Sequence, residues 1–449
     1  EELEVSLEHL LLLSNKYHCV VDNPPYMGGG KMNKELSSWV KTNYPRSKSD
    51  LMACFMEVGL SILLPKGVLG MINQHSWMFL SSYESLREEL IKNVHIDTLL
   101  HLGPRTFPEI GGEVVQNAAF TLINEESNKK GNYLRLVNLN SSSLKREKTL
   151  EAIQNPDCEW FYNANQKDFS KIPGSPIGYW LSKKLIQIFS DSLTINSIAQ
   201  PRAGLQTGDN LKFLRIWHEI NQNILGVGFS NEEAAKSQYK WYPYNKGGAF
   251  KKWYGNREYV VNWMNNGQEL REDKLYKLSI GKCLPGNSKP HNSQYYFKES
   301  ITWSFVSSGT FGVRYSPKGS VYDIAGSSVF PKPNDIKYLC SFMNSKLAFE
   351  MLKVLAPTIN FQVGDIKRLP IIFPANNDLE YINSISNEII GIVKSEDDSR
   401  ELSWDFNQNE LLRIKNEDIE ESYDLYQQYW TNKFFQLHKN EEELNRQFI

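Results

Sequence analysis

An asparagine, two prolines and a tyrosine, Asn23 to Tyr26, follow a short apolar run and have the residue types to hold a planar amine. The nitrogen of such an amine is a poor nucleophile because its lone pair is delocalised into the ring. Acceptors on its two protons draw it towards tetrahedral geometry, and the Asn23 side-chain oxygen and the Pro24 carbonyl are two neutral acceptors. Pro24 and Pro25 restrict the backbone that carries them. Tyr26 offers a flat face on which a flipped-out base can stack.

Two other interpretations of this stretch remain open. Gly28 to Gly30 precede Lys31, as in a phosphate-binding loop, but that loop requires a hydroxyl residue after the lysine and a glycine five positions before the last one. Met32 and Pro25 occupy those positions. A tight turn without chemistry also fits, because Asn-Pro is a turn former. We interpret the three glycines as the hinge of a polar loop over about 27–48.

The neighbouring segments predict how this stretch is positioned. Residues 16–22 are a β-branched run typical of a buried strand, and 50–63 are apolar at helical spacing with Asp50 as a possible N-cap. Further runs predict strands at 68–72, 95–103 and 113–124 and a helix over 81–93, and the last two strands could form an antiparallel hairpin at the sheet edge. This alternation indicates a doubly wound α/β sheet, which keeps its ligands at the carboxyl ends of its strands.

Length and composition set limits on the whole chain. It has 449 residues, which predicts two or three domains, and 50 basic against 52 acidic residues, so any DNA-binding surface must be local. The five scattered cysteines suggest neither disulfides nor a metal site, and no metal is expected. No apolar run approaches membrane-spanning length and no signal peptide opens the chain. We therefore expect a cytoplasmic protein that does not engage membranes.

Changes of composition divide the chain into four parts. We expect the C-terminal part of a doubly wound catalytic domain over 1–140 and a polar connector with a helical piece over 141–195. Residues 196–375 are rich in Gly, Trp, Tyr and Asn with short strand-like runs, which predicts a mixed, β-rich domain. Charge runs at helical spacing predict a helical segment over 376–449.

Candidate nucleic-acid contacts lie in the third part. Gln206, Thr207, Asp209 and Asn210 form a polar loop whose side chains can read base edges or phosphates. Lys251 and Lys252 belong to a stretch that interleaves basic and aromatic residues, and Arg314 is a weaker candidate. The alternatives are a turn built from turn-forming residues and a solvated charged face.

The order of these motifs resembles a known family. Asn-Pro-Pro-Tyr after a strand, followed by "DLMACFMEVGLSILLPKGVLGMI", is similar to the gamma class of adenine-N6 DNA methyltransferases, which use S-adenosylmethionine. The stretch "LHLGPRTFPEIGGEVVQNAAFTLI" resembles the last catalytic-domain motif of that class. The resemblance implies that Phe107 holds the flipped adenine against Tyr26. From the residue alone, Phe107 is equally well a core or loop aromatic.

The second half narrows the resemblance. "PRAGLQTGDNLKFLRIWHE", "SWDF" at 403–406 and "HKNEEELNRQFI" resemble the large phage-exclusion methyltransferases of the BREX or PglX type. This implies methyl transfer from S-adenosylmethionine to a flipped-out adenine at specific sites of double-stranded DNA, in phage defence or restriction–modification. It also implies that 196–375 is the target-recognition domain, that other defence proteins are partners, and that Asn23 and Pro25 edge the methionine pocket.

One departure from the family bears on activity. The family's glycine-rich cofactor loop precedes Asn-Pro-Pro-Tyr, whereas the 22 residues before Asn23 contain no glycine. We therefore expect a fragment or split product that lacks the main cofactor-binding half and is inactive alone. Two alternatives stay open, namely a non-catalytic DNA-recognition component of a defence system and a protein-glutamine methyltransferase, which shares the Asn-Pro-Pro-Tyr motif.

Overall fold

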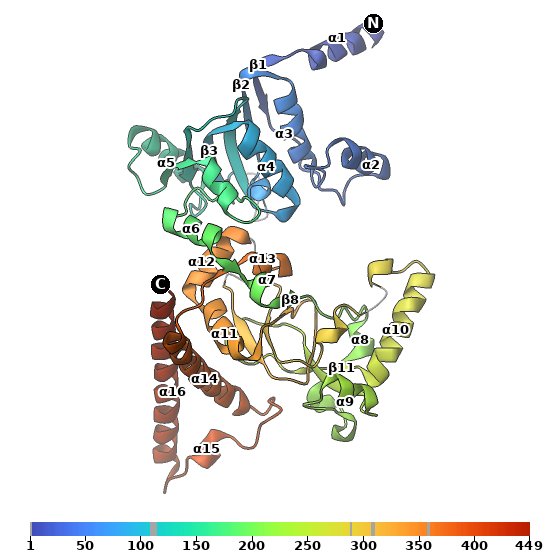
Figure 1. Ribbon diagram of the computed structural model, residues 1–449, viewed down its shortest axis with the longest axis vertical. Coiled ribbons are helices and arrows are strands. Elements are labelled where there is room, and N and C mark those ends of the chain that lie inside the picture. Colours follow the sequence, from blue (N-terminus) through green and yellow to red (C-terminus); the bar gives the residue numbers. More distant parts are fainter. Residues whose placement is uncertain (1, 108–114, 288–289, 307–309, 357–359) are drawn as a thin grey trace. The chain divides into compact units, whose positions relative to one another are not determined.

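The computed structural model describes residues 2–107, 115–287, 290–306, 310–356 and 360–449. They form two compact units, Glu1–Asp191 and Ser192–Ile449, whose elements are labelled in Figure 1. Among the described residues, no helix combines the length and the apolar character that crossing a membrane requires.

A six-stranded sheet in the order β1-β2-β4-β3-β5-β6 forms the centre of the first unit. Its strands are β1 (Tyr17–Asp22), β2 (Leu63–Gln74), β3 (His95–Gly103), β4 (Asn117–Ile123), β5 (Lys130–Arg135) and β6 (Phe161–Asn165). β1 runs parallel to β2 and β3 runs parallel to β5, while β4 is antiparallel to both β2 and β3. The carboxyl ends of β1, β2, β3 and β5 therefore share one edge of the sheet.

This topology confirms the expected α/β class and corrects one detail. β3 and β4 do form an antiparallel pair, but β4 lies between β2 and β3 rather than at the sheet edge. The outer strand on that side is β6, which pairs with β5. The first unit consequently continues to Asp191, beyond the residue 140 at which we expected the catalytic part to end.

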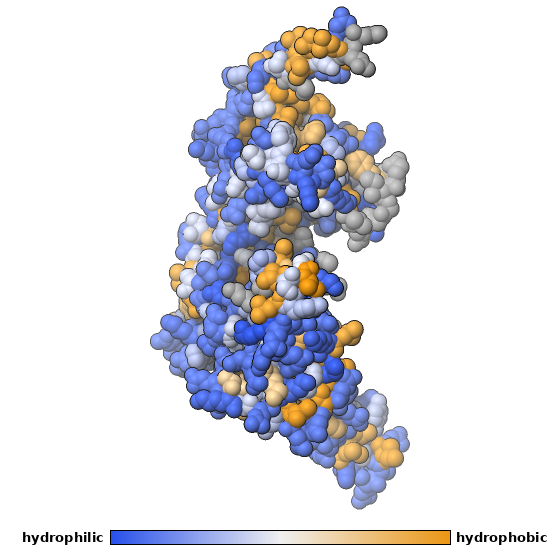
Figure 2. Space-filling view, turned by 90° about the vertical axis from the view of Figure 1, so that its right-hand side faces the viewer, coloured by the Kyte–Doolittle hydropathy of each residue, from blue (hydrophilic) through white to orange (hydrophobic). Residues whose placement is uncertain are grey.

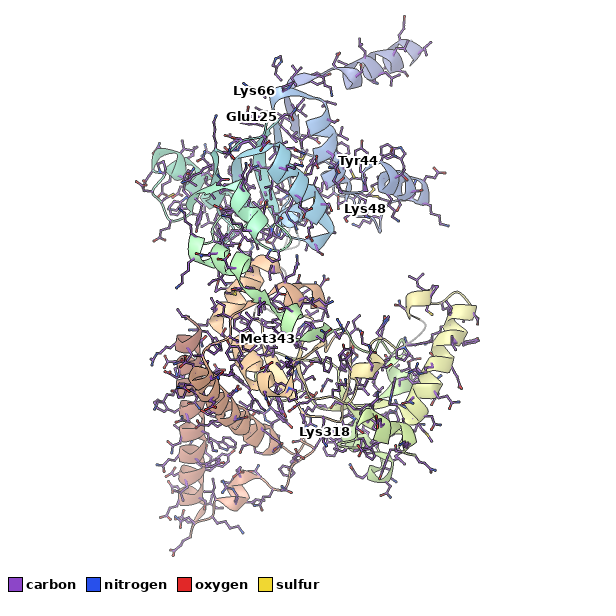
Figure 3. The ribbon with its side chains drawn as sticks, viewed as in Figure 1. Tyr44, Lys48, Lys66, Glu125, Lys318 and Met343 are labelled. Atoms are coloured by element: carbon purple, nitrogen blue, oxygen red, sulfur yellow. The ribbon has the colours of Figure 1, made fainter. Side chains whose placement is uncertain are left out.

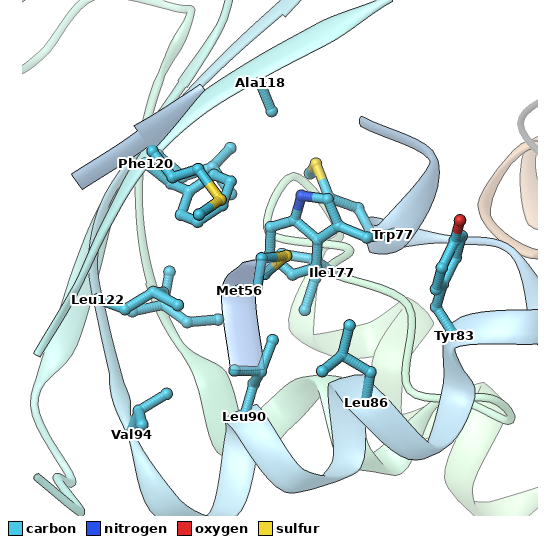
Figure 4. Packing of buried hydrophobic residues seen from close by; sticks show 14 of the residues in the cluster. Met56, Trp77, Tyr83, Leu86, Leu90, Val94, Ala118, Phe120, Leu122 and Ile177 are labelled. Atoms are coloured by element: carbon cyan, nitrogen blue, oxygen red, sulfur yellow. The ribbon is translucent and has the colours of Figure 1, made fainter. Parts of the chain in front are cut away.

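Helices cover one face of this sheet. The helices of the unit are α1 (Glu2–Ser14), α2 (Lys34–Asn43), α3 (Leu51–Ser61), α4 (Glu84–Asn93), α5 (Ser142–Gln154) and α6 (Lys183–Asp191). Alternate residues of the central strands, such as Phe120 and Leu122, pack against Met56, Leu86 and Leu90 of α3 and α4 (Figure 4). The expected N-cap is confirmed, because the Asp50 side chain accepts a hydrogen bond from the Met52 amide.

The opposite face is covered only in part. Leu134, Leu136 and Ala152 form a small cluster that joins α5 to the strands β3 and β5. Nearer β1 this face is open, and Val21 of β1 is 79% exposed. Apolar side chains of α1 also lie at the surface, at the top of the view in Figure 2.

The second unit combines short strands with a helical tail, as expected. Two four-stranded sheets have the orders β14-β10-β11-β9 and β13-β12-β15-β8, and β16 pairs with β7. The strands are β7 (Leu193–Thr194), β8 (Gln200–Arg202), β9 (Leu214–Ile216), β10 (Trp241–Asn245), β11 (Tyr259–Asn262), β12 (Ser300–Trp303), β13 (Val313–Ser316), β14 (Val321–Tyr322), β15 (Ser328–Phe330) and β16 (Pro370–Ile371). The helices are α7 (Ile195–Ile198), α8 (Asn210–Phe213), α9 (Asn231–Lys236), α10 (Met264–Ser279), α11 (Ile336–Asn344), α12 (Lys346–Leu355), α13 (Val363–Arg368), α14 (Asn376–Asp398), α15 (Glu410–Arg413) and α16 (Ile419–Phe448).

Residues 335–355 are apolar at helical spacing throughout, yet they form two helices. α11 and α12 are separated by Ser345, which is extended with ψ 155° and caps α12 by accepting a hydrogen bond from the Ala348 amide. The helical spacing of the apolar residues continues through the break, which is why periodicity alone does not reveal it.

Candidate active site

The Asn23–Tyr26 stretch leaves β1 at the sheet edge where the carboxyl ends of the parallel strands meet. The Asn23 side chain is exposed and Pro24 is buried. Within the described part of the chain, no group donates a hydrogen bond to the Asn23 amide oxygen or to the Pro24 carbonyl. The Asn23 amide oxygen is therefore both exposed and unengaged, whereas the Pro24 carbonyl is unengaged within a buried residue.

Tyr26 is held from its hydroxyl end. Its ring packs against the core of the first unit, and its hydroxyl accepts a hydrogen bond from the Asn117 side-chain amide at 3.0 Å. Asn117 opens β4, is 1% exposed and lies in register with Gln74 of β2 and Gly103 of β3. Burial raises the pKa of Tyr26, so the phenol stays neutral at physiological pH. The orientation of this ring is thus set by a residue 91 positions further along the chain.

Asp50 ties the same stretch to α3. One carboxylate oxygen accepts hydrogen bonds from the Met27 amide at 3.0 Å and from the Met52 amide at 3.1 Å. The Leu51 amide donates to the Met27 carbonyl at 3.1 Å, and Gly28 and Asp50 form a β-bridge. The expected loop over 27–48 therefore has its two ends tied together, and it contains helix α2.

Phe107 lies in the connection that follows β3 at the same sheet edge and is half-buried. Gly103 and Arg105 adopt left-handed φ values of 69° and 57°, and the Thr106 hydroxyl donates to the Gly103 carbonyl at 3.0 Å. Lys145 of α5, which is buried, donates to the Pro104 carbonyl. Residues 108–114 lie outside the described part, and the stacking role of Phe107 stays a prediction.

Two histidines that the motifs did not single out join β2 to β3 beside this site. His75 Nδ1 lies 2.8 Å from His101 Nε2, and His101 Nδ1 lies 3.1 Å from the Tyr179 hydroxyl. Burial lowers the pKa of His75 to about 4 and the pKa of His101 well below its usual range. Both rings are therefore neutral near pH 7 and are weak bases. Their positions at the ends of two expected strands are the only sequence signal that indicates them.

A hollow of about 430 Å³ on the open sheet face adjoins Asn23. Asp22 contributes a carboxylate, and apolar residues of β2, β3 and β4, including Ile72 and Leu100, form most of the wall. The described lining contains no basic side chain. Such a lining suits a ligand with an apolar chain and a cationic group. No group of three or more His, Cys, Asp or Glu residues in the described ranges is placed to hold a metal ion.

In the second unit, the 206–210 loop is mainly a structured turn. Thr207 is 4% exposed and its hydroxyl donates to the Asn210 side-chain oxygen at 2.6 Å. Asp209 caps α8 by accepting from the Lys212 amide at 3.0 Å. Gln206 and Asn210 are exposed. The expectation that Thr207 reaches DNA is corrected, because its side chain is buried within the turn.

The other expected DNA contacts differ in accessibility. Lys251 pairs with Asp397 at 2.8 Å and Lys252 pairs with Glu441 at 3.3 Å, both from the helical tail. The prediction for Arg314 is wrong, because its side chain is 1% exposed. β13, which carries Arg314, pairs with the fully buried strand β12, so the guanidinium points into the unit.

The known proteins that resemble this chain in sequence are methyltransferases, as its motifs predict. Residues 3–107 match the family model of the Eco57I restriction-modification methylase. The chain is 40% identical over 446 residues to the adenine-specific methyltransferase PglX of Lacticaseibacillus casei (strain Zhang), covering 97% of this chain and 36% of that protein. It is 37% identical over 449 residues to the adenine-specific methyltransferase BrxX of Escherichia coli O9:H4 (strain HS), covering 99% of this chain and 34% of that protein. The chain spans about a third of the length of these curated relatives.

Solved structures show the same fold at low sequence identity. The Type IIL restriction-modification enzyme MmeI in complex with DNA is similar with a TM-score of 0.58 at 11% identity, covering 96% of this chain and 53% of that one. A nuclease-deletion mutant of the Type ISP enzyme LlaGI, in complex with a DNA substrate mimic, has a TM-score of 0.50 at 12% identity, covering 86% of this chain and 42% of that one. Nearly the whole chain is homologous in sequence to one part of the adenine-specific methyltransferases PglX and BrxX. This homology confirms the resemblance inferred from its motifs.

Proposed function

We propose that this chain provides the base-holding part and the target-recognition part of a site-specific DNA methyltransferase that modifies N6 of adenine, in bacterial phage defence or restriction–modification. The observation that supports this most directly is the exposed Asn23 amide oxygen, which accepts no hydrogen bond from the described residues and lies next to the unengaged Pro24 carbonyl at the carboxyl edge of the sheet. The adenine amine has two protons, and this edge offers two acceptors to match them.

The chain's residues divide the work of the reaction. Asn23 and Pro24 accept hydrogen bonds from the two N6 protons, which leaves the nitrogen lone pair free to react. Tyr26, fixed by Asn117, stacks on one face of the flipped base, and Phe107 covers the other face. S-adenosylmethionine, when bound, supplies the methyl group from its sulfonium sulfur. After transfer one N6 proton leaves to solvent, since His75 and His101 are weak bases near pH 7.

The residues beside Asn23 fit part of this methyl donor. The hollow offers the Asp22 carboxylate for a cationic group and apolar side chains for a methionine chain. We propose that Asn23 and Pro25 form the edge of this pocket, with Asn23 serving both the amine and the donor.

We also propose that the second unit reads double-stranded DNA. Gln206, Asp209 and Asn210 lie on its turn surface, and Lys251 and Lys252 reach phosphates by exchanging their carboxylate partners for them. Support comes from MmeI and LlaGI, whose structures are complexes with DNA and with a DNA mimic. Partnership with further defence proteins belongs to the same proposal.

The test is Asn23→Ala in a protein of the relatives' full length. We expect adenine methylation, measured as N6-methyladenine by mass spectrometry, to fall by about 100-fold or more, because loss of one positioned acceptor in such a site costs several kcal/mol. Asn128→Ala is the control, since Asn128 is also exposed but lies at the opposite edge of the sheet. Unchanged methylation in the Asn23 variant would contradict the assigned role.

A non-catalytic DNA-recognition component is the second candidate. It is favoured by the open sheet face, because the hollow there lacks basic residues among its described lining and fits only part of the methyl donor. Calorimetry with S-adenosylmethionine separates the two. Absence of binding by a protein of the relatives' full length would favour the non-catalytic component.

A further inference from the structure

We infer that the segment 30–48, which carries α2, is an arm that contacts the phosphate backbone of duplex DNA beside the target base. This inference rests on the proposed function, because it takes DNA to be the ligand of the neighbouring site. It places the phosphate contacts of the first unit on a segment distinct from the basic stretch of the second unit.

The arm carries positive charge that no carboxylate of the described residues neutralises. Its basic residues are Lys31, Lys34, Lys41, Arg46 and Lys48, and its single acidic residue is Glu35. All four lysines are exposed, and none forms an ion pair with any residue that the structure describes. Arg46 alone is engaged, with Glu57 at 3.6 Å and Glu89 at 2.5 Å. Four free ammonium groups on one short segment suit a polyanion.

The lysines expected to bind DNA in the second unit are in a different state. Lys251 pairs with Asp397 at 2.8 Å and Lys252 pairs with Glu441 at 3.3 Å. A paired lysine must release its carboxylate before it can neutralise a phosphate, whereas a free lysine releases only water and counterions. The lysines of the arm are therefore the better phosphate ligands.

The outer face of α2 adds neutral hydrogen-bonding groups. Ser38, Trp39, Thr42 and Asn43 line a shallow hollow together with Lys34 and Glu35, and the Trp39 side chain is 54% exposed. The Thr42 hydroxyl and one N–H of Asn43 donate to carbonyls of the helix, which leaves the Ser38 hydroxyl and the second Asn43 N–H for a ligand. Hydroxyl and amide side chains are common donors to phosphate and sugar oxygens. An indole in a polar setting provides apolar contact while its N–H stays available. This mixture fits a sugar–phosphate backbone better than it fits the apolar surface of a protein partner.

The arm is rooted directly beside the base-holding residues. Asp50 binds the Met27 amide, one residue after Tyr26, and Gly28 forms a bridge with Asp50. Figure 3 shows Tyr44 and Lys48 on the part of the arm that projects beside α3. α2 has 10 residues and rises about 15 Å, a length over which one DNA strand passes roughly four phosphates. A duplex that delivers a base to Tyr26 therefore brings its flanking phosphates to this arm.

The test compares two triple variants of the 449-residue chain. Lys34→Gln, Lys41→Gln and Lys48→Gln remove three charges of the arm. Lys92→Gln, Lys129→Gln and Lys130→Gln remove three exposed lysines that likewise lack an ion pair among the described residues, at the opposite edge of the sheet. Circular dichroism confirms that both variants fold. The dissociation constant for duplex DNA is then measured over a range of salt concentrations.

Each lost phosphate contact lowers the slope of log affinity against log salt by about 0.9. We expect the arm variant to lose about two to three from that slope and to bind DNA roughly 10- to 100-fold more weakly at low salt, with the other triple variant close to the parent chain. An unchanged slope, or an equal loss in both variants, would overturn the inference. Retained DNA binding with loss of binding to another anionic partner would overturn it as well.

Steady-state kinetics of the full-length protein distinguish a failure of this inference from a failure of the proposed function. The arm variant should raise the KM for DNA with kcat largely retained, whereas Asn23→Ala should lower kcat with DNA affinity retained. If Asn23→Ala leaves methylation intact while the arm variant loses DNA affinity, the base-holding role fails and the arm stands. The reverse outcome removes the arm and leaves the proposed function in place.

Discussion

At the scale of single residues, the site is built from neutral polar groups. Asn23 and Pro24 present uncharged acceptors, and burial keeps the phenol of Tyr26 protonated by raising its pKa. His75 and His101 hydrogen bond to each other as neutral rings. In the proposed reaction, an amine held by neutral acceptors would keep its own protons until its nitrogen has reacted, because no strong base competes for them.

The histidine pair predicts a specific dependence of stability on pH. The pKa of His75 is about 4 in the folded chain against its ordinary value of 6.5, so the unfolded state binds more protons between these values. The free energy of unfolding should therefore be complete above pH 6.5 and should fall by roughly 3 kcal/mol as the pH drops towards 4. Urea unfolding of the chain and of the His75→Gln variant, at pH values above 6.5 and near 4, measures this change in the free energy of unfolding. Between pH 6.5 and 4 the free energy of unfolding should fall less in His75→Gln than in the parent chain. His438→Gln, at an exposed position on α16, should behave like the parent.

At the scale of elements, one arginine connects α4 to two separate segments. Arg87 is fully buried and donates to the carbonyls of Trp77 and Leu80 at 2.9 and 2.7 Å and to those of Gly174 and Ser175 at 2.6 and 3.1 Å. These bonds hold the turn after β2 and the segment before α6 against the helix. The turn after β2 contains His75, so Arg87 also supports the edge that carries the site.

Arg87→Met should destabilise the first unit by about 3 kcal/mol or more, because it leaves several buried carbonyls without a donor. Arg146→Met, at an exposed position of α5, should change stability by less than about 1 kcal/mol. Chemical denaturation followed by fluorescence compares the two. Equal stability of the two variants would show that the carbonyls find other donors.

At the scale of the whole molecule, the helical tail and the β-rich part form one compact unit rather than two domains. Trp404, between α14 and α16, stacks on Trp217 with ring centroids 5.5 Å apart, and its N–H donates to the Arg257 carbonyl. The Trp217 N–H donates to the Leu402 carbonyl at 2.9 Å. The ion pairs of Lys251 and Lys252 join the same two parts.

Trp404→Ala should loosen the connection between α14 and α16 while the rest of the unit stays folded. We expect the free energy of unfolding of the second unit to fall by about 2 kcal/mol, since a half-buried indole and its hydrogen bond are removed. Limited proteolysis over residues 399–418 should become several-fold faster. Phe435→Ala removes a side chain that is 71% exposed and should leave cleavage unchanged. Equal cleavage in the two variants would show that the ion pairs alone hold the tail.

The sequence by itself determined the features that depend on neighbouring residues. The end of β1 before Asn23, the cap at Asp50 and the alternation of strands and helices follow from local backbone preferences and side-chain periodicity. The family resemblance rests on the same short stretches, so the fold class and the place of Asn23 to Tyr26 after a strand were predictable.

Only the tertiary structure decided which of the candidate groups are accessible. β4 lies inside the sheet because strand pairing joins residues distant in sequence, and packing within the second unit leaves Arg314 only 1% exposed. Lys252 meets Glu441 across 189 positions, so its charge is neutralised by a partner that no local pattern indicates. The lysines between Gly30 and Ser49 form no ion pair with the described residues, because the fold brings no carboxylate of those residues close to them. Charge is a property of residue type, but whether it is available to a ligand depends on long-range contacts.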